Sequence, residues 1–239
     1  EEKFTSSLEF NLTGAQKRTW DEIRSDLTGN LPMRRLLQGD VGSGKTLVGA
    51  LSALHAHENG WQTAFMCPTE ILAEQHHLSL SEWFSSLGLR VELLTGSTNA
   101  SDRKEIISKL KSGEINILVG THALFQEDVI FNCLGLTVID EQHRFGVHQR
   151  FSMLEKGGTK NQSPHQLIMT ATPIPRTLAM TVYGSLETSI IDEMPPGRRP
   201  VETSARPNSL RQKVIKRIEE VCLSGQRVYW VCTLIEESE

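Results

Sequence analysis

The sequence has no long apolar run and lacks the features that define several protein classes. Its longest apolar run, residues 228–235, is interrupted by Thr233 and is far shorter than the roughly 20 residues that cross a bilayer. The four cysteines form no C-x-x-C pair, so a reducing cytoplasm fits. Because no histidine has zinc spacing with them, most histidines, His76 and His77 among them, are expected to be structural. Lys and Arg total 25 against 29 Asp and Glu, which confines any nucleic-acid contact to a local surface.

The composition is that of a globular protein. Hydrophobic residues make up 38% and charged residues 23% of the 239 residues, so disordered and fibrous classes are excluded. A chain of this length holds one large domain or somewhat more. It begins at Glu1 without an initiator Met or a signal-peptide pattern, and it ends at Glu239 directly after a strand-like run. We therefore expect a piece of a longer protein.

Short strand-like runs alternate with helical patterns along most of the chain. This order predicts an α/β fold with a mostly parallel sheet covered by helices. A capping box from Thr13 to Gln16 predicts the start of a helix with Trp20, Ile23 and Leu27 on one face. Strands are expected at 35–38, 63–67, 91–94, 115–119, 136–139 and 166–170.

A change in composition marks a domain boundary. Three prolines and a glycine fall within residues 194–200 and exclude regular secondary structure there. The expected parts are a first domain at 1–194, a linker at 195–200 and the start of a second domain at 201–239. This last part carries a helical pattern from Leu210 to Val221 and a strand-like run at 228–232, which is too little for a closed domain.

One segment has the pattern G-x-x-x-x-G-K-[ST] between a predicted strand and a predicted helix, the context in which this pattern binds phosphate. It consists of Gly39, Asp40, Val41, Gly42, Ser43, Gly44, Lys45 and Thr46. The glycines allow backbone N–H groups to converge on phosphate oxygens at a helix N-terminus. Lys45 would neutralise the β and γ phosphates of ATP, and Thr46 would offer its hydroxyl to Mg²⁺. The alternative is an ordinary flexible glycine turn.

A pair of acidic residues follows the apolar run 134–139. Because ligands bind at the carboxyl ends of strands in open α/β sheets, Asp140 and Glu141 are placed where a nucleotide would lie. Asp140 would hold Mg²⁺, largely through water, and Glu141 would polarise the water that attacks the γ-phosphate. An isolated acidic pair is more often a solvated strand end. The phosphate-binding loop in the same chain favours the functional interpretation.

The order of these segments resembles that of the superfamily 2 helicases. Asp-Glu-x-His at 140–143 follows a phosphate-binding loop, and residues 66–75, 94–96, 119–122 and 170–172 resemble further motifs of these enzymes.

Two longer segments resemble particular families within superfamily 2. Residues 140–147 and 170–177 look like those of the RecG helicases and the related transcription-repair coupling factors. Gln142 favours the RecG helicases, since the coupling factors usually carry a second acid there. Residues 229–238 resemble the start of the second motor lobe of RecG helicases, so the resemblance covers nearly the whole chain.

This resemblance implies a RecA-like motor lobe that uses ATP and Mg²⁺. Gln16 would read the adenine base. His143 would link the nucleotide site to Thr170 and Thr172, which would change hydrogen-bond partners on hydrolysis.

The resemblance also implies three strand-end loops that contact DNA. Small hydroxyl residues and free N–H groups can hold a phosphate backbone without reading bases. The residues are Pro68, Thr69, Thr95, Gly96, Gly120 and Thr121. The alternative is that the threonines cap helices, which Thr favours in any case, and both interpretations can hold for one residue.

The implied activity is ATP-driven unwinding and translocation on double-stranded DNA without sequence specificity. It would remodel branched DNA, such as stalled forks and Holliday junctions, in recombination and repair. A coupling-factor-like translocase is the alternative within this class. A P-loop kinase for a small molecule would need an acceptor pocket and lid, whereas this chain has helicase-like loops at 68–69 and 170–172. A nucleotide-gated binding module is disfavoured by Glu141, since a switch without turnover needs no strong water activator.

The resemblance further predicts what lies outside the chain. A junction-binding wedge domain would precede Glu1, and the remainder of the second motor lobe would follow Glu239. That lobe would supply the arginines that complete the ATP site; Arg198, Arg199 and Arg206 match no such motif. Since a transition-state arginine is worth about 10³ to 10⁵ in rate, we expect the chain alone to hydrolyse ATP scarcely at all.

Overall fold

The computed structural model describes residues 2–8, 10–141, 163–172, 186–197 and 201–231. Its strands are β1 (Arg34–Gly39), β2 (Gln62–Met66), β3 (Val91–Leu94), β4 (Ile117–Gly120), β5 (Leu134–Asp140), β6 (His165–Thr170) and β7 (Glu187–Ile191). Its helices are α1 (Glu2–Ser7), α2 (Gly14–Leu27), α3 (Lys45–Glu58), α4 (Glu70–Ser85), α5 (Ala100–Ser112) and α8 (Arg211–Leu223), with 3₁₀ turns η1 (His122–Phe125) and η3 (Asn208–Leu210). Among these residues, no helix is both long and apolar enough to cross a membrane.

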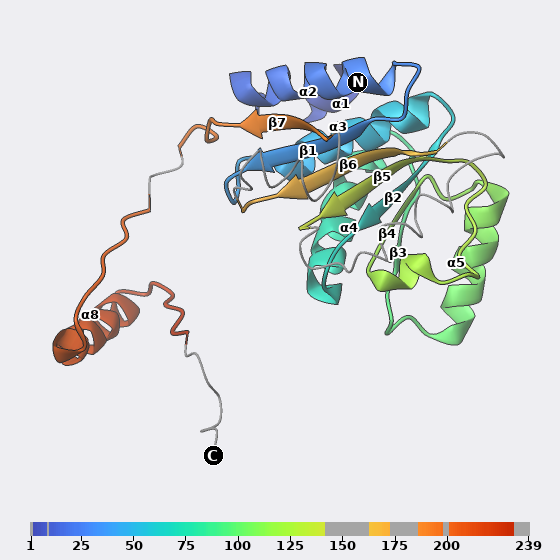
Figure 1. Ribbon diagram of the computed structural model, residues 1–239. Helices are drawn as coiled ribbons and strands as arrows, with labels where there is room; N and C mark the ends of the chain where they lie inside the picture. Colours follow the sequence, from blue (N-terminus) through green and yellow to red (C-terminus); the bar gives the residue numbers. More distant parts are fainter. Residues whose placement is uncertain (1, 9, 142–162, 173–185, 198–200, 232–239) are drawn as a thin grey trace. The chain divides into compact units, whose positions relative to one another are not determined.

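The described strands form one seven-stranded sheet in the order β3-β4-β2-β5-β6-β1-β7 (Figure 1). Every adjacent pair is parallel, which confirms the predicted α/β class. Because all strands run in one direction, their carboxyl ends meet at a single edge of the sheet. Ligands bind at this edge in open α/β folds.

Apolar side chains cover both faces of the sheet. Successive strand residues point to opposite faces, so Phe65 of β2 packs in one core with α1, α2, α3 and α4. Its neighbours Ala64 and Met66 pack in the other core, with residues of α5 and η1. Burial on both faces explains why the central strands read as nearly continuous apolar runs.

The predicted capping box begins α2. The Thr13 hydroxyl accepts a hydrogen bond from the Gln16 N–H at 3.2 Å, and the Gln16 side-chain oxygen accepts one from the Thr13 N–H at 3.0 Å. Trp20 and Ile23 are buried on one face of this helix, and Leu27 packs against the same core. The sequence prediction for α2 is confirmed.

Strand β7 was not predicted from the sequence. It begins with three polar residues, Glu187, Thr188 and Ser189, and lies directly before the proline-rich segment. It pairs in parallel with β1, and the buried Arg35 of β1 donates from Nη1 to the Ser189 hydroxyl at 2.9 Å. The same guanidinium donates from Nε to Asp26 of α2 at 2.8 Å. Hydrogen bonding by the buried Arg35 thus holds β7 at the edge of the sheet. Because β7 begins with polar residues, its sequence has no apolar pattern that would predict a strand.

The chain divides into two compact units, Glu1–Gly197 and Arg198–Glu239. In the second unit, α8 corresponds to the predicted helix, and none of its residues is buried. Residues 226–231 have no regular secondary structure, so the strand predicted at 228–232 was wrong over these residues. A strand needs a hydrogen-bonded neighbour, and the described part of this unit offers none.

At Gly120, the last residue of β4, the backbone of β3 lies too close for a side chain. A Cβ here would lie 2.1 Å from the Leu94 carbonyl oxygen and 3.0 Å from the Leu124 side chain. The carbonyl belongs to the paired backbone of β3 and cannot move away freely. We expect Gly120→Ala to lower the free energy of unfolding by about 1–3 kcal/mol, measured by urea unfolding followed by circular dichroism.

Gly14→Ala is the control for this substitution. A Cβ on Gly14, the first residue of α2, would lie 3.4 Å from Glu193 Oε2, which is an ordinary contact. The expected change in the free energy of unfolding is within about 0.5 kcal/mol. Equal losses in the two variants would contradict the close approach of β3 and β4.

Candidate functional site

The phosphate-binding loop lies between β1 and α3, at the carboxyl edge of the sheet. Gly42 and Gly44 have positive φ angles of 76° and 92°, which residues with a side chain rarely adopt. A Cβ on Gly44 would also lie 2.2 Å from the side-chain nitrogen of Gln16. The loop therefore requires glycine at 44 both for its backbone and for its contact with α2.

Lys45 is the first residue of α3 and is buried. Its Nζ donates to the carbonyl oxygens of Gly39 at 2.7 Å and Asp40 at 3.0 Å. Burial lowers the pKa of Lys45, although nearby carboxylates, led by Asp140 and Glu141, act in the opposite direction. The ammonium group thus lies among the loop carbonyls and within electrostatic reach of the acidic pair, where phosphate oxygens could replace the carbonyl partners.

Gln16 bonds to the phosphate loop in this structure. Its Nε2 donates to the Ser43 carbonyl oxygen at 2.7 Å, while its side-chain oxygen accepts from Thr13 in the capping box. Both polar ends of this buried amide are therefore occupied. An adenine contact stays a prediction, and it would require Gln16 to exchange one of these partners.

Asp140 and Glu141 lie at the carboxyl end of β5 and have different partners. Asp140 is buried, and its Oδ2 lies 2.8 Å from Nε2 of His76 on α4. Glu141 has a φ of 51°, and no other non-glycine residue in the described part of the chain has a positive φ. Such backbone strain occurs most often at functional sites.

The segment after β6 binds the Glu141 carboxylate. The Thr170 hydroxyl donates to Oε2 at 3.1 Å, and the Ala171 N–H donates to Oε1 at 3.0 Å. Thr172 donates its N–H to the Thr170 hydroxyl at 3.1 Å. The acidic pair and residues 170–172 are therefore joined directly through Glu141. His143, which was expected to make this link, lies outside the described residues.

The donor set near Lys45 fits a magnesium ion that is bound together with a nucleotide. Thr46 follows Lys45 in α3, and the Asp140 carboxylate acts on Lys45 electrostatically. In the described ranges, no group of three or more His, Cys, Asp or Glu side chains could hold a metal by itself. Mg²⁺ needs no such cage, because it keeps several waters and is bound through one or two carboxylates plus substrate phosphates.

The residues expected to contact DNA lie in three loops at one half of the edge. These loops follow β2, β3 and β4, which are neighbours in the sheet, whereas β5, β6 and β1 lead to the acidic pair, Thr170 and the phosphate loop (Figure 1). The sheet order thereby places six residues on one side of the phosphate loop and the acidic pair. They are Pro68, Thr69, Thr95, Gly96, Gly120 and Thr121.

The helix-cap alternative holds for Thr69 but not for Thr95 or Thr121. The Thr69 hydroxyl accepts from the Leu72 N–H at 3.4 Å at the start of α4. Thr121 precedes η1 without capping it, and its buried hydroxyl has no hydrogen-bond partner among the described residues. Thr95 shares a 2.9 Å hydrogen bond with the Ser97 hydroxyl. Helix capping therefore explains neither the Thr95 hydroxyl nor the Thr121 hydroxyl.

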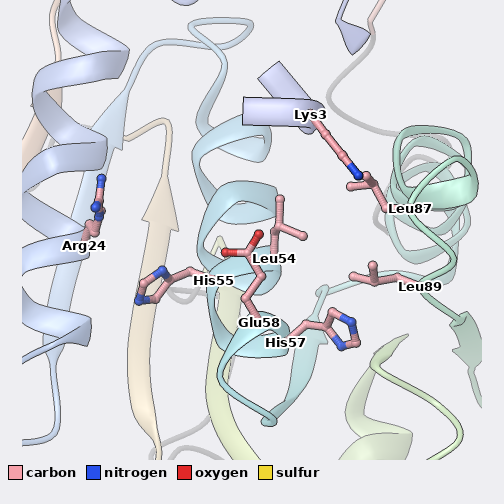
Figure 2. A pocket seen from close by; sticks show the side chains of 8 residues that line it. All are labelled: Lys3, Arg24, Leu54, His55, His57, Glu58, Leu87 and Leu89. Atoms are coloured by element: carbon pink, nitrogen blue, oxygen red, sulfur yellow. The ribbon is translucent and has the colours of Figure 1, made fainter. Parts of the chain in front are cut away.

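A cavity of about 640 Å³ lies away from this edge. It is lined by Lys3, Arg24, Leu54, His55, His57, Glu58, Leu87 and Leu89. Figure 2 shows that His55, His57 and Glu58 come from the last turns of α3, the helix that begins at the phosphate loop. Because a helix rises 1.5 Å per residue, this cavity is about 20 Å from the loop and is separate from the nucleotide residues.

A family model described as DEAD/DEAH box helicase matches residues 13–181. The chain belongs to the DEAD/DEAH box helicases. This membership favours the helicase interpretation over the P-loop kinase alternative, and it agrees with the division of the sheet edge into nucleotide and strand-end loops.

Individual helicases are similar to this chain over its whole length. The ATP-dependent DNA helicases RecG of Pasteurella multocida and Escherichia coli K12 are 56% and 55% identical to it over 239 and 238 residues. The matches cover 100% and 99% of this helicase chain but 34% of each relative, so the chain spans about a third of their length. A solved structure of RecG bound to a three-way DNA junction is 46% identical, with a TM-score of 0.82 over 94% of this chain and 30% of that one.

Sequence reasoning missed His76, which was expected to be structural. In α4 it lies in the buried stripe formed with Ala73, Leu80 and Phe84, so a histidine at an apolar position of the helix was the available signal. That it meets Asp140 could not be read from this signal.

Glu141→Gln tests the role of the strained acid in this helicase. The amide keeps the shape of the side chain, and the Thr170 hydroxyl can accept a hydrogen bond instead of donating one. We expect the variant of the full-length protein to keep its nucleotide affinity and to lose about 10²- to 10⁴-fold in ATP hydrolysis, measured by phosphate release.

Glu187→Gln removes the same charge from an exposed residue at the start of β7, at the opposite edge of the sheet. It should leave hydrolysis unchanged. Hydrolysis at the parent rate by the Glu141 variant would assign water activation to another residue.

Proposed function

We propose that the protein containing this chain is an ATP-driven motor that translocates on double-stranded DNA and remodels branched DNA, such as stalled forks and Holliday junctions, in recombination and repair. The support is the 55–56% identity to RecG helicases over the whole chain and the 46% identity to a RecG bound to a three-way DNA junction. We also propose a cytoplasmic location, which free Cys67, Cys133 and Cys222 favour.

The observation that carries this proposal is the division of the carboxyl edge into two halves. One half, β5-β6-β1, holds the phosphate loop and the acidic pair, and the adjacent half, β3-β4-β2, holds the hydroxyl-bearing and glycine-bearing loops. A nucleotide and a DNA backbone could therefore lie side by side on one rigid sheet. This neighbourhood is what a motor that couples hydrolysis to movement along DNA requires.

In the nucleotide half, each residue has a proposed role. The N–H groups of residues 39–44 and the start of α3 would bind the phosphates of ATP. Lys45 would neutralise the β and γ phosphates, and Thr46 and Asp140 would hold Mg²⁺, which stabilises the developing charge. Glu141, oriented by Thr170 and Ala171, would activate the attacking water.

In the DNA half, the contacts would be to the phosphate backbone. Backbone N–H groups and the hydroxyls of Thr69, Thr95 and Thr121 can donate to phosphate oxygens without reading bases. Thr69 is the strongest candidate among these threonines because it is exposed, whereas Thr95 and Thr121 are only 4% and 2% exposed and would need a shift of their loops to reach a phosphate.

We propose that residues 1–194 form the first motor lobe, 195–200 a linker, and 201–239 the start of a second lobe. The boundary between the two compact units falls between residues 197 and 198 of the chain, within the proposed linker. The second lobe would complete the ATP site with a transition-state arginine, so hydrolysis by the chain alone should be very slow.

The direct test is the ATPase rate of the full-length protein with no DNA, with linear duplex and with a four-way junction. We expect the junction to raise the rate on the order of tenfold or more, which corresponds to about 1.4 kcal/mol of transition-state stabilisation. Stimulation by duplex alone, together with displacement of RNA polymerase, would favour the coupling-factor-like alternative. A rate independent of any DNA would overturn the proposal.

DNA binding by the chain itself is a second prediction. Its formal net charge is −4 and the proposed contacts are to phosphates, so binding should be weak, should fall steeply with added salt and should be the same for different base sequences. Fluorescence anisotropy with two duplexes of unrelated sequence at several salt concentrations measures this. A sequence preference that survives at high salt would count against translocation.

A further inference from the structure

A hydrogen bond crosses the boundary between the two halves of the sheet edge. His76 lies on α4, which follows β2 in the DNA half, and Asp140 ends β5 in the nucleotide half. Nε2 of His76 lies 2.8 Å from Oδ2 of Asp140, and the two residues are only 7% and 9% exposed. A polar pair buried to this degree has a defined geometry, because leaving either group unpartnered is costly.

The imidazole of His76 is fixed by packing. Its ring lies 5.0 Å from the ring of Phe65 between centroids, at an interplanar angle of 46°. Phe65 belongs to β2, the strand that pairs with β5. The histidine is therefore held against the sheet beside the strand whose end carries Asp140.

The first turn of α4 is attached to a different part of the DNA half. Both oxygens of the Glu70 carboxylate accept hydrogen bonds from Ser97, one from its N–H at 3.1 Å and one from its hydroxyl at 2.9 Å. Ser97 directly follows Thr95 and Gly96, and Thr69 caps the same helix. One helix thus joins the loops after β2 and β3 to the carboxylate of Asp140.

The distance along α4 is short enough for rigid transmission. Glu70 and His76 are six residues apart, which corresponds to about 9 Å of helix at 1.5 Å per residue. A displacement of the first turn when a phosphate backbone binds would therefore move the His76 imidazole with it. Coupling of this kind is reciprocal, so metal and nucleotide at Asp140 would also change the affinity of the loops for DNA.

We propose that His76 is a positioning residue that orients Asp140 for Mg²⁺ and couples the metal site to the DNA-contacting loops through α4. The inference rests on the proposed function, because it requires Asp140 to hold the metal and the loops to hold DNA. A hydrogen bond from outside the metal's own ligands fixes the rotamer of a liganding carboxylate, and loss of such a partner typically reduces metal affinity or activity about 10- to 100-fold.

The test uses three variants of the full-length protein. His76→Leu fills the space with an apolar side chain and removes the donor, whereas His76→Gln keeps an N–H at similar reach. His77→Leu is the matched control, since His77 is the next residue of α4 and its Nε2 lies 3.3 Å from the Val91 carbonyl oxygen rather than near Asp140.

The first readout is the affinity for fluorescent ADP, titrated with Mg²⁺ and repeated in EDTA. We expect His76→Leu to raise the Mg²⁺ concentration for half-maximal effect about 10- to 100-fold, with unchanged affinity in EDTA. His76→Gln should restore most of the loss, and His77→Leu should behave as the parent protein. If His76→Leu does not fold, as judged by its thermal unfolding, His76→Met takes its place, because it also removes the donor while its flexible side chain adapts to the site, and it should show the same shift in Mg²⁺ dependence.

The second readout is the stimulation of ATP hydrolysis by junction DNA at saturating Mg²⁺. His76→Leu should lose most of this stimulation, whereas His77→Leu should be stimulated as strongly as the parent protein. Unchanged Mg²⁺ dependence in the Leu variant, or equal effects of the Leu substitutions at 76 and 77, would overturn the role of His76. If no DNA stimulates the parent protein, the proposed function fails. The Mg²⁺ dependence of the affinity for ADP then still decides whether His76 orients Asp140.

Discussion

The parallel pairing of β2 with β5 is the constraint on which the site depends. Met66 is opposite Ile139 in this register, so the two strands end side by side. The end of β2 leads into α4, and the end of β5 presents Asp140 and Glu141. Without this pairing, the strand-end loops and the acidic pair would be on separate parts of the molecule. Parallel pairing requires a long crossover, and the helices of the crossovers supply the core that buries both faces.

In the nucleotide half of the sheet edge, hydrogen bonds to the Glu141 side chain offset the strain in the Glu141 backbone. A left-handed backbone at a non-glycine residue costs of the order of 1–3 kcal/mol, and Glu141 has this conformation. Its carboxylate receives two hydrogen bonds from the segment after β6, each of a kind that is stronger when the acceptor is charged. The buried Lys45 is stabilised in the same way by carbonyl and carboxylate oxygens. Under the proposed function, charges and donors fixed in this way would stabilise the charge that develops during ATP hydrolysis.

The DNA half is built differently. It offers hydroxyls and backbone N–H groups. The Glu70 carboxylate in this half accepts two hydrogen bonds from Ser97. Under the proposed function, such a surface would hold a DNA backbone without sequence preference, because neutral donors to phosphate oxygens do not read bases. The negative net charge of the chain agrees with contacts that are few and local.

The sequence by itself determined the features that depend on neighbouring residues. The phosphate loop, the acidic pair, the capping box of α2 and six strands could all be predicted, because loop chemistry, capping and burial periodicity are local properties. The order of the strands, the attachment of the polar strand β7 by Arg35 and the contact of Gln16 with Ser43 were decided only by the tertiary structure. The same is true of His76 and Asp140, which are 64 residues apart and meet because β2 and β5 are neighbours. No pattern along the chain specifies which strands become neighbours, since every buried parallel strand carries the same apolar signal.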